Sequence, residues 1–337
     1  MEESKKHRVG VKAIAGQAIH KTKEDRKQKV ENIRKLKRSG KQMKRRLLST
    51  FMQEDGKVMS STSLQEDWEA PTISNASIKR MKMILSCEMN ENVHGKMRDH
   101  KIPSRMIHAL TSSSIGITKE EKDRTRNILF CLANLATISE YTQNFVLLVP
   151  FLHTLLTNTS SSCTDDNTSQ CCEFAMWLIG NASADNVPFR DAIILQILPT
   201  IITKLHEHEG VATTAWALSN LARGSGKAVP FLQAGILSPL CLLLQKKVEN
   251  ICKEIGWILC FLTAKEDEFV DQLLAMPGAL SLIVGNMKSK EDDLSIPFLR
   301  ILGNISAGKL EWGQKLLTEL YFLENVVMTL HDETASS

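Results

Sequence analysis

The sequence predicts an all-α protein built as a solenoid, which is a stack of similar helical repeats. The first observation behind this prediction is a helical motif whose copies begin at residues 130, 177, 216, 257 and 300, at intervals of 47, 39, 41 and 43 residues. The second is that apolar segments with helical periodicity fill these intervals. The third is the composition, in which 43% of the 337 residues are hydrophobic but only 5% are aromatic. A core of mostly aliphatic side chains is therefore expected.

The motif is clearest in residues 171–182. At about 100° per residue, the apolar side chains at 172, 175, 179 and 182 fall on one side of a helix. Trp177 and Asn181, four residues apart, share the opposite side. Because an amphipathic helix normally buries its indole, we expect this helix to have a second face with a purpose other than core packing.

The same pair of positions can be aligned along the chain, although some copies carry substitutions. The pairs are Phe130 and Asn134, Trp177 and Asn181, Trp216 and Asn220, Trp257 and Phe261, and Arg300 and Asn304. A helical repeat of about 40–47 residues is typical of armadillo and HEAT solenoids. The predicted fold is a right-handed armadillo-repeat solenoid of about six repeats over residues 79–331.

Charge is distributed unevenly along the chain. Residues 1–50 hold 17 Lys and Arg against 5 Asp and Glu, which leaves 25 basic and 33 acidic residues in the rest. Residues 1–50 are too polar to pack a core and are predicted to form a basic, conditionally disordered arm. Residues 51–78 contain turn-forming and Ser-rich stretches that favour a flexible linker, and the polar residues 159–169 are expected to form an inserted loop.

Several functional classes find no support in the sequence. The eight cysteines form no CxxC pair, which indicates reduced thiols rather than a disulfide framework. The N-terminus has no apolar signal segment, and no apolar run reaches the ~18–20 residues of a membrane span, so a soluble protein is expected. Residues 224–227 are similar to a phosphate-binding loop but lack its first Gly and its final hydroxyl residue. We expect no enzymatic activity, no cofactor and no metal site.

The motif and its exceptions resemble importin-α, the armadillo adaptor of nuclear import. Trp-Leu-Ile-Gly-Asn at 177–181 and Trp-Ala-Leu-Ser-Asn-Leu at 216–221 are similar to the third helices that line the groove of that family. The order of the exceptions matches too, because the family has an aromatic residue for Asn in its fifth repeat and Arg for Trp in its sixth, like Phe261 and Arg300. The resemblance covers roughly residues 20–330.

The basic arm resembles the importin-β-binding segment of the same family. Arg-Lys-Leu-Lys-Arg at 34–38 and Lys-Arg-Arg at 44–46 have the internal spacing of that segment. The resemblance implies binding of importin-β, or autoinhibition by a cargo mimic at high effective concentration. The residues implied in either role are Arg34, Lys35, Lys37, Arg38, Lys44, Arg45 and Arg46.

The chain also departs from the importin-α pattern. It has fewer repeats than the family, so the second cargo site of the family, built on later repeats, would be incomplete. Phe130 replaces the first Trp of the groove, and Ile138 lies where the family tends to have a small residue in its main lysine pocket. Such divergence also resembles the importin-α-related transmembrane and coiled-coil domain-containing protein 6 group.

The third helices are expected to line a concave groove that holds an extended peptide. Asn amides would hydrogen-bond the peptide backbone, and neighbouring indoles would form slots for Lys or Arg stems, each worth about 0.5–2 kcal/mol of cation–π attraction. The resemblance places Asp185 in the pocket that selects a lysine ammonium. The predicted cargo-binding residues are Asn134, Trp177, Asn181, Asp185, Trp216, Asn220, Trp257, Arg300 and Asn304. Alternatively, the Asn side chains cap main-chain carbonyls within each repeat.

The sequence thus predicts a nuclear-import adaptor that binds Lys/Arg-rich localisation signals in its groove and importin-β through its arm, and that shuttles between cytoplasm and nucleus. A non-transport armadillo scaffold that holds another basic or extended protein segment is the alternative. Nucleic-acid binding through the arm is a third hypothesis, but the arm lacks interleaved aromatic residues, so nucleic acid is not expected to be the partner. No small-molecule substrate is expected.

Overall fold

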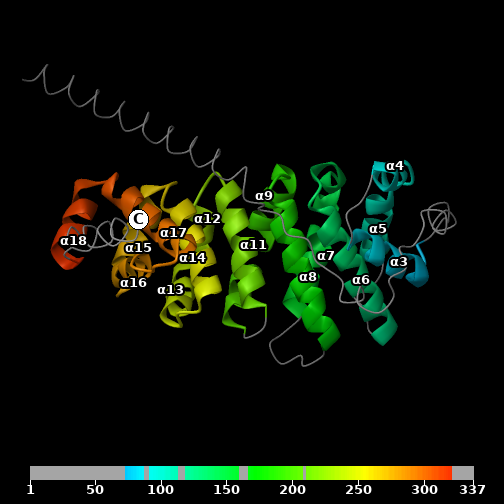
Figure 1. The fold of residues 1–337 in the computed structure, drawn as a ribbon, viewed down its shortest axis with the longest axis horizontal. Helices are drawn as coiled ribbons and strands as arrows, with labels where there is room; N and C mark the ends of the chain where they lie inside the picture. The colour runs from blue at the N-terminus through cyan, green and yellow to red at the C-terminus, as the bar shows by residue number, and fades with distance from the viewer. Residues whose placement is uncertain (1–72, 87–90, 113–117, 159–165, 208–209, 321–337) are drawn as a thin grey trace, which may run out of the picture. The chain divides into compact units, whose positions relative to one another are not determined.

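The computed structural model describes residues 73–86, 91–112, 118–158, 166–207 and 210–320, which form helices and contain no β-strand (Figure 1). The helices are α3 (Asn75–Leu85), α4 (Glu91–Asp99), α5 (Ile102–Thr111), α6 (Lys119–Leu135), η3 (Ser139–Thr142), η4 (Phe145–Leu148), α7 (Val149–Asn158), α8 (Asp166–Ala182), α9 (Val187–Gln196), α10 (Leu198–Thr203), η5 (Lys204–His206), α11 (Val211–Gly224), α12 (Val229–Gln233), α13 (Leu237–Gln245), α14 (Glu249–Leu262), α15 (Asp267–Ala275), α16 (Ala279–Met287), α17 (Asp292–Ser306) and α18 (Leu310–Leu320). The predicted arm and most of the predicted linker lie outside this part of the chain.

The helices repeat in groups, and each group ends in a long third helix. The third helices contact one another in chain order, from α3 through α6, α8, α11 and α14 to α17. The preceding helices stack in the same way, with α7 on α10, α13 on α16 and α12 on α15. Figure 1 shows this succession from α3 to α18. The predicted solenoid is confirmed, because each group packs against its neighbours in the sequence, and six third helices lie in the described ranges.

Local signals in the sequence explain where several helices begin. Thr118 and Glu121 form a capping box at α6, in which the Thr118 hydroxyl accepts from the Glu121 amide at 3.2 Å and the Glu121 carboxylate accepts from the Thr118 amide at 2.9 Å. Asn186 caps α9 by accepting from the Phe189 amide at 2.9 Å. Helix α8 begins already at Asp166, so the predicted loop 159–169 is wrong for its last four residues.

Two glycines make the turns between the first and second helices of their repeats. Gly235 lies between α12 and α13 with φ of 74°, and Gly278 lies between α15 and α16 with φ of 73°. A side chain at such a left-handed position would bring its Cβ close to the following carbonyl oxygen. These glycines therefore allow each second helix to fold back sharply against the first.

A buried Phe recurs in the first segment of successive repeats. The side chains are Phe145, Phe189, Phe231 and Phe269, all with no exposed surface. The rings of Phe145 and Phe189 meet edge to face at a centroid distance of 6.2 Å. Full burial of one such side chain contributes roughly 1.5–3 kcal/mol to folding. Four successive repeats thus each place one fully buried ring in their first segment.

Neighbouring repeats are also linked through polar groups at their turns. The Glu266 carboxylate accepts from the main-chain amides of Ala228 at 2.6 Å and Val229 at 2.9 Å, at the start of α12 in the preceding repeat. A carboxylate is favourable there because the first amides of a helix have no partner within the helix. The amides that follow the Gly-Ser-Gly-Lys stretch thus bind a carboxylate of the protein itself rather than a phosphate.

The structure also describes the apolar helices, the possible metal ligands and one buried thiol. In the described ranges no single helix is long and apolar enough to cross a bilayer; α15 and α16 meet the criteria only together, and the chain bends by 99° between them. The same ranges hold no group of three or more His, Cys, Asp or Glu side chains that could bind a metal ion. Cys131 is a free thiol, and burial raises its pKa to about 12, so it is not a reactive thiolate.

Candidate peptide-binding face

The residue pairs found in the sequence occupy equivalent positions on α6, α8, α11, α14 and α17. Because each of these helices packs against the next, the first members of the pairs form one row and the second members, one turn later, form another. We call the surface that carries both rows the third-helix face. The first row is Phe130, Trp177, Trp216, Trp257 and Arg300, and the second is Asn134, Asn181, Asn220, Phe261 and Asn304.

Asn side chains of the second row join each third helix to the one before it. In three cases among the described residues, the Asn Nδ2 donates to a main-chain carbonyl of the preceding third helix. The acceptor is the residue directly before the second-row residue of that helix. These hydrogen bonds run from Asn181 to Ala133 O (2.9 Å), from Asn220 to Gly180 O (3.1 Å) and from Asn304 to Cys260 O (3.0 Å). These acceptors belong to the preceding repeat. The alternative drawn from the sequence, in which each Asn caps a carbonyl of its own repeat, does not describe these hydrogen bonds. A primary amide can make up to four hydrogen bonds, so this contact uses only part of its capacity.

Trp177 and Trp216 form a contiguous aromatic surface at the middle of the first row. Their ring centroids are 5.0 Å apart and their planes are tilted by 46°. An alkyl stem between two rings needs about 7–8 Å, twice a normal carbon–carbon contact of about 3.5–4.0 Å. The expected slot between these two indoles is therefore closed, because the rings pack on each other. A Lys or Arg stem would instead lie along their shared surface.

Gly180 makes the packing of Trp216 possible. A Cβ added at Gly180 would lie 2.4 Å from the Trp216 ring, well inside any normal contact. Trp216 is consequently buried against α8, whereas Trp177 is only partly buried. The indole N–H of Trp177 is shielded from solvent and has no hydrogen-bond partner in the described part of the chain.

At the C-terminal end of the face, a cation of the protein itself stacks on the aromatic row. The Trp257 and Phe261 rings are stacked, with centroids 5.9 Å apart and planes 21° apart. The Arg300 guanidinium lies 5.2 Å from the centroid of the Trp257 ring. This geometry is a cation–π contact, and it occupies the ring face that a ligand cation would use.

The N-terminal end of the face has a matching arrangement. The Lys82 ammonium lies 4.8 Å from the centroid of the Phe130 ring and donates to Asn127 Oδ1 at 3.3 Å. Burial, and to a lesser extent the nearby Arg126 guanidinium, lower the pKa of Lys82. Phe130 also meets Phe174 edge to face at 5.5 Å. Internal cations thus flank the central Trp177–Trp216 surface on both sides.

Asp185 lies in the turn between α8 and α9, shortly after Asn181. Its side chain is exposed, and its carboxylate accepts from the Ser139 hydroxyl at 2.6 Å. Burial lowers the pKa of the nearby Arg223, while the negative charge of Asp185 acts in the opposite direction. The Asp185 carboxylate is therefore fixed in place by Ser139 and electrostatically coupled to Arg223.

Sequence reasoning missed Glu254 as a candidate ligand-binding residue. This carboxylate is buried on α14, one turn before Trp257, and accepts from the Ser219 hydroxyl at 2.9 Å. The hydroxyl in turn lies next to Asn220 in the chain. Glu254 precedes Trp257 by three residues, so the two side chains lie on the same side of the helix. This spacing is visible in the sequence and could have indicated Glu254.

The structure brings nearly all of the predicted cargo-binding side chains onto one face. Asn134 occupies the second-row position of α6 and is buried there. Asp185 lies at the edge of the face rather than within a row. The predicted importin-β-binding residues of the arm, at 34–46, lie outside the described residues. Their role remains a prediction.

Curated relatives with similar sequences are importin subunits. Importin subunit alpha-9 of Arabidopsis thaliana is 31% identical over 185 residues, which cover 53% of this chain and 34% of the relative. Importin subunit alpha-2 of Oryza sativa subsp. japonica is 35% identical over 99 residues, which cover 28% of this chain and 19% of the relative. The chain thus matches about a third of the first relative and a fifth of the second. No protein-family model matches it.

Solved structures show the fold. A designed armadillo repeat protein superposes with a TM-score of 0.57 at 20% identity, over 71% of this chain and 97% of the design. Another design, solved in complex with the peptide (KR)4, superposes with a TM-score of 0.54 at 22% identity, over 68% of this chain and 98% of the design. The protein is therefore an armadillo-repeat solenoid that is similar in sequence to importin-α subunits over about half of its length.

Proposed function

We propose that the third-helix face binds an extended, Lys/Arg-rich peptide segment and that the protein is a nuclear-import adaptor for proteins that carry such segments. The observation that carries this proposal is the combination of an Asn row with a parallel aromatic row, to which Asp185 and Glu254 add negative charge. Amides bind a main chain whatever its sequence. Aromatic faces and carboxylates add the preference for cationic side chains.

The comparisons support the proposal at a coarser level. Both curated relatives are named as importin α subunits, and a designed armadillo repeat protein holds an alternating Lys-Arg peptide. By extension we assign the arm to importin-β, through Arg34, Lys35, Lys37, Arg38, Lys44, Arg45 and Arg46. An adaptor of this kind would move between cytoplasm and nucleus. The arm could also occupy the third-helix face in the absence of cargo.

A second candidate is a non-transport scaffold that holds one short basic segment. It is favoured by the internal contacts of Lys82 with Phe130 and of Arg300 with Trp257, which leave Trp177 and Trp216 as the central aromatic surface. The resemblance to the transmembrane and coiled-coil domain-containing protein 6 group belongs with this candidate.

Fluorescence anisotropy with a labelled Lys-rich signal peptide tests the binding site. We expect saturable binding to the full chain, tighter binding when Lys44, Arg45 and Arg46 are replaced by Ala, and loss of binding on adding Asn181→Ala and Asn220→Ala. Titration with importin-β then separates the candidates. Binding of both partners supports the adaptor, and binding of the peptide alone supports the scaffold. A folded arm variant that binds no basic peptide would overturn both.

A further inference from the structure

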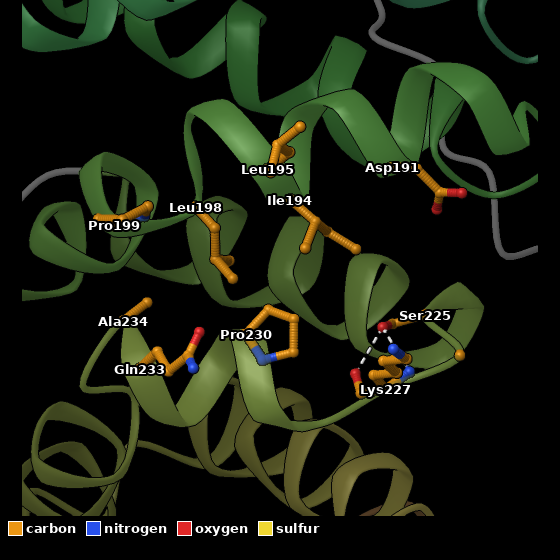
Figure 2. A pocket seen from close by; sticks show the side chains of 11 residues that line it. Asp191, Ile194, Leu195, Leu198, Pro199, Ser225, Lys227, Pro230, Gln233 and Ala234 are labelled. Carbon is orange, nitrogen blue, oxygen red and sulfur yellow. Dashed lines mark hydrogen bonds between the residues drawn. The ribbon is translucent and has the colours of Figure 1, made fainter.

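A cavity separate from the third-helix face lies between the first two helices of one repeat, α9 and α10, and the first helix of the next repeat, α12. The cavity has a volume of about 630 Å³ and is lined by α9, α10, α12 and the turn that follows α11 (Figure 2). None of its lining residues belongs to the aromatic and Asn rows of the third-helix face. We call it the edge cavity. The ligand of the edge cavity is independent of the function proposed for the third-helix face.

The wall of the edge cavity is mainly apolar. Ile194 and Leu198 on one side point toward Pro230 of α12 on the other (Figure 2). Leu195 stands at the rim, and 81% of its surface is exposed. A leucine exposed to this degree next to an apolar hollow is a favourable contact for a partner. Covering its apolar surface lowers the free energy of the complex by roughly 25 cal/mol per Å². The apolar surface extends past the rim, as a peptide that continues beyond the hollow would require.

One end of the edge cavity carries one acidic and one basic side chain, and only the acidic one has an ion-pair partner within the described residues. Asp191 lines this end, but its carboxylate is paired with the Arg190 guanidinium at 3.2 Å. The Lys227 side chain is exposed, and within the described residues its ammonium has no ion pair or hydrogen bond. The backbone of Lys227 is held by the Ser225 hydroxyl, which accepts from the Lys227 amide at 3.1 Å and donates to its carbonyl at 2.6 Å. The ammonium is thus presented from an ordered turn.

We propose that the edge cavity binds a short acidic peptide segment of a partner protein. Two apolar side chains of that segment enter between Ile194, Leu198 and Pro230, and an Asp or Glu side chain pairs with Lys227. Leu195 packs against the part of the peptide that lies outside the hollow. The charge preference is opposite to that of the third-helix face, so that the two sites hold different partners at once. Such grooves read apolar anchors at helical or extended spacing.

The test begins with a phage library of random 12-residue peptides selected on the full chain. Phage that also bind the Leu195→Glu, Lys227→Glu double variant are removed. We expect enriched sequences with two apolar residues within one helical turn and at least one Asp or Glu. Both substituted side chains are exposed, so circular dichroism should show unchanged helicity. If Leu195→Glu misfolds, Leu195→Ser replaces it.

The best-enriched peptide is then labelled and titrated with single variants. Leu195→Glu and Lys227→Glu should each raise its Kd about tenfold, which corresponds to roughly 1.4 kcal/mol. Leu242→Glu on α13 and Lys246→Glu directly after it are matched controls, since both side chains are exposed and neither lines the cavity, and they should leave Kd unchanged. The peptide (KR)4 should not displace the bound peptide.

Three outcomes would overturn the proposal. The first is that no sequence is enriched in a manner that depends on Leu195 and Lys227. The second is enrichment of basic sequences at this site. The third is displacement of the selected peptide by (KR)4, which would assign it to the third-helix face. None of these outcomes decides whether the third-helix face binds basic signals, because that face is measured with a different peptide.

Discussion

At the level of the single residue, the buried amides of Asn181 and Asn220 and the partly buried amide of Asn304 have a structural task. Each bonds a carbonyl of the preceding third helix, which helps to fix the distance between neighbouring helices. Under the proposed function the same side chains also bind a peptide backbone, because a primary amide can make up to four hydrogen bonds. Stability and recognition would then depend on the same residues, and any substitution must be judged on both.

We expect the double variant Asn181→Ala, Asn220→Ala to lose both properties. Each substitution leaves a buried carbonyl without its partner, so the free energy of unfolding should fall by about 1–3 kcal/mol per site. Denaturant titration measures this loss, and anisotropy with the basic peptide should show no binding by the folded fraction. The control is Asn286→Ala, because Asn286 bonds Leu282 O within its own helix, away from the face. Unchanged peptide affinity would contradict the assignment of the Asn row.

Gly180 allows a sharper test at the same scale. Gly180→Ala should lower the free energy of unfolding by about 1–3 kcal/mol, because its Cβ would collide with the Trp216 ring, 2.4 Å away. Tryptophan fluorescence should change as the indole moves. Gly303→Ala is the matched control, since Gly303 holds the equivalent position before Asn304 and a Cβ there meets nothing within 4 Å. It should stabilise the helix by roughly 0.5–1 kcal/mol. Equal effects at both sites would refute the packing argument.

At the scale of the element, helix starts and turns follow local chemistry, whereas the contacts between elements do not. The capping box at Thr118 and the Asn186 cap could be predicted from short sequence patterns. The Glu266 cap on α12 could not, because donor and acceptor come from different repeats. The early start of α8 within a polar stretch has the same origin, since Asn167 in its first turn accepts a hydrogen bond from the Arg126 guanidinium of α6.

The last described helix, α18, is attached to α15 by a polar cluster. Asp271 accepts from Lys309 Nζ at 2.6 Å and from the Trp312 indole N–H at 2.7 Å. These hydrogen bonds, first that of Lys309 and then that of Trp312, hold the pKa of the Asp271 carboxyl below its ordinary value. Such a group stabilises the fold above its unfolded-state pKa of about 3.9, and the contribution disappears as pH falls through the lower folded-state value.

Acidification should therefore loosen α18 before the rest of the solenoid. Hydrogen exchange at pH values from 5 down to about 3 should show faster exchange in α18 than in α11. Asp271→Asn should give this fast exchange already at pH 5 and abolish most of its pH dependence. Glu268→Gln is the control, since it removes one charge from the same helix while its partner, Gln272, lies within α15. If the Asn variant keeps the pH dependence of the parent, another carboxylate is responsible.

At the scale of the whole molecule, the sequence predicted the repeat architecture because its signal is periodic. Five copies of one motif at similar intervals indicate that the helices which carry them occupy equivalent positions in successive repeats. In the structure these helices pack against one another in chain order. It also predicted the two rows of the third-helix face. It could not predict the closed contact of Trp177 with Trp216, nor the cations on Phe130 and Trp257, because these depend on rotamers of residues about 40–50 positions apart.

Under the proposed function, those internal cations would limit the length of the peptide that the third-helix face holds. With Arg300 on Trp257, a basic ligand that extends beyond α11 must displace a contact worth about 0.5–1 kcal/mol at a partly exposed site. Arg300→Ala should therefore raise the affinity for a peptide with two basic clusters by about two- to fivefold, while affinity for a single cluster stays the same. Anisotropy with both peptides measures the difference. Arg98→Ala, which removes an exposed guanidinium paired with Glu140 at 3.4 Å, should change neither affinity. A gain shared equally by both peptides would indicate a general electrostatic effect, and the aromatic row would then not set the length of the ligand.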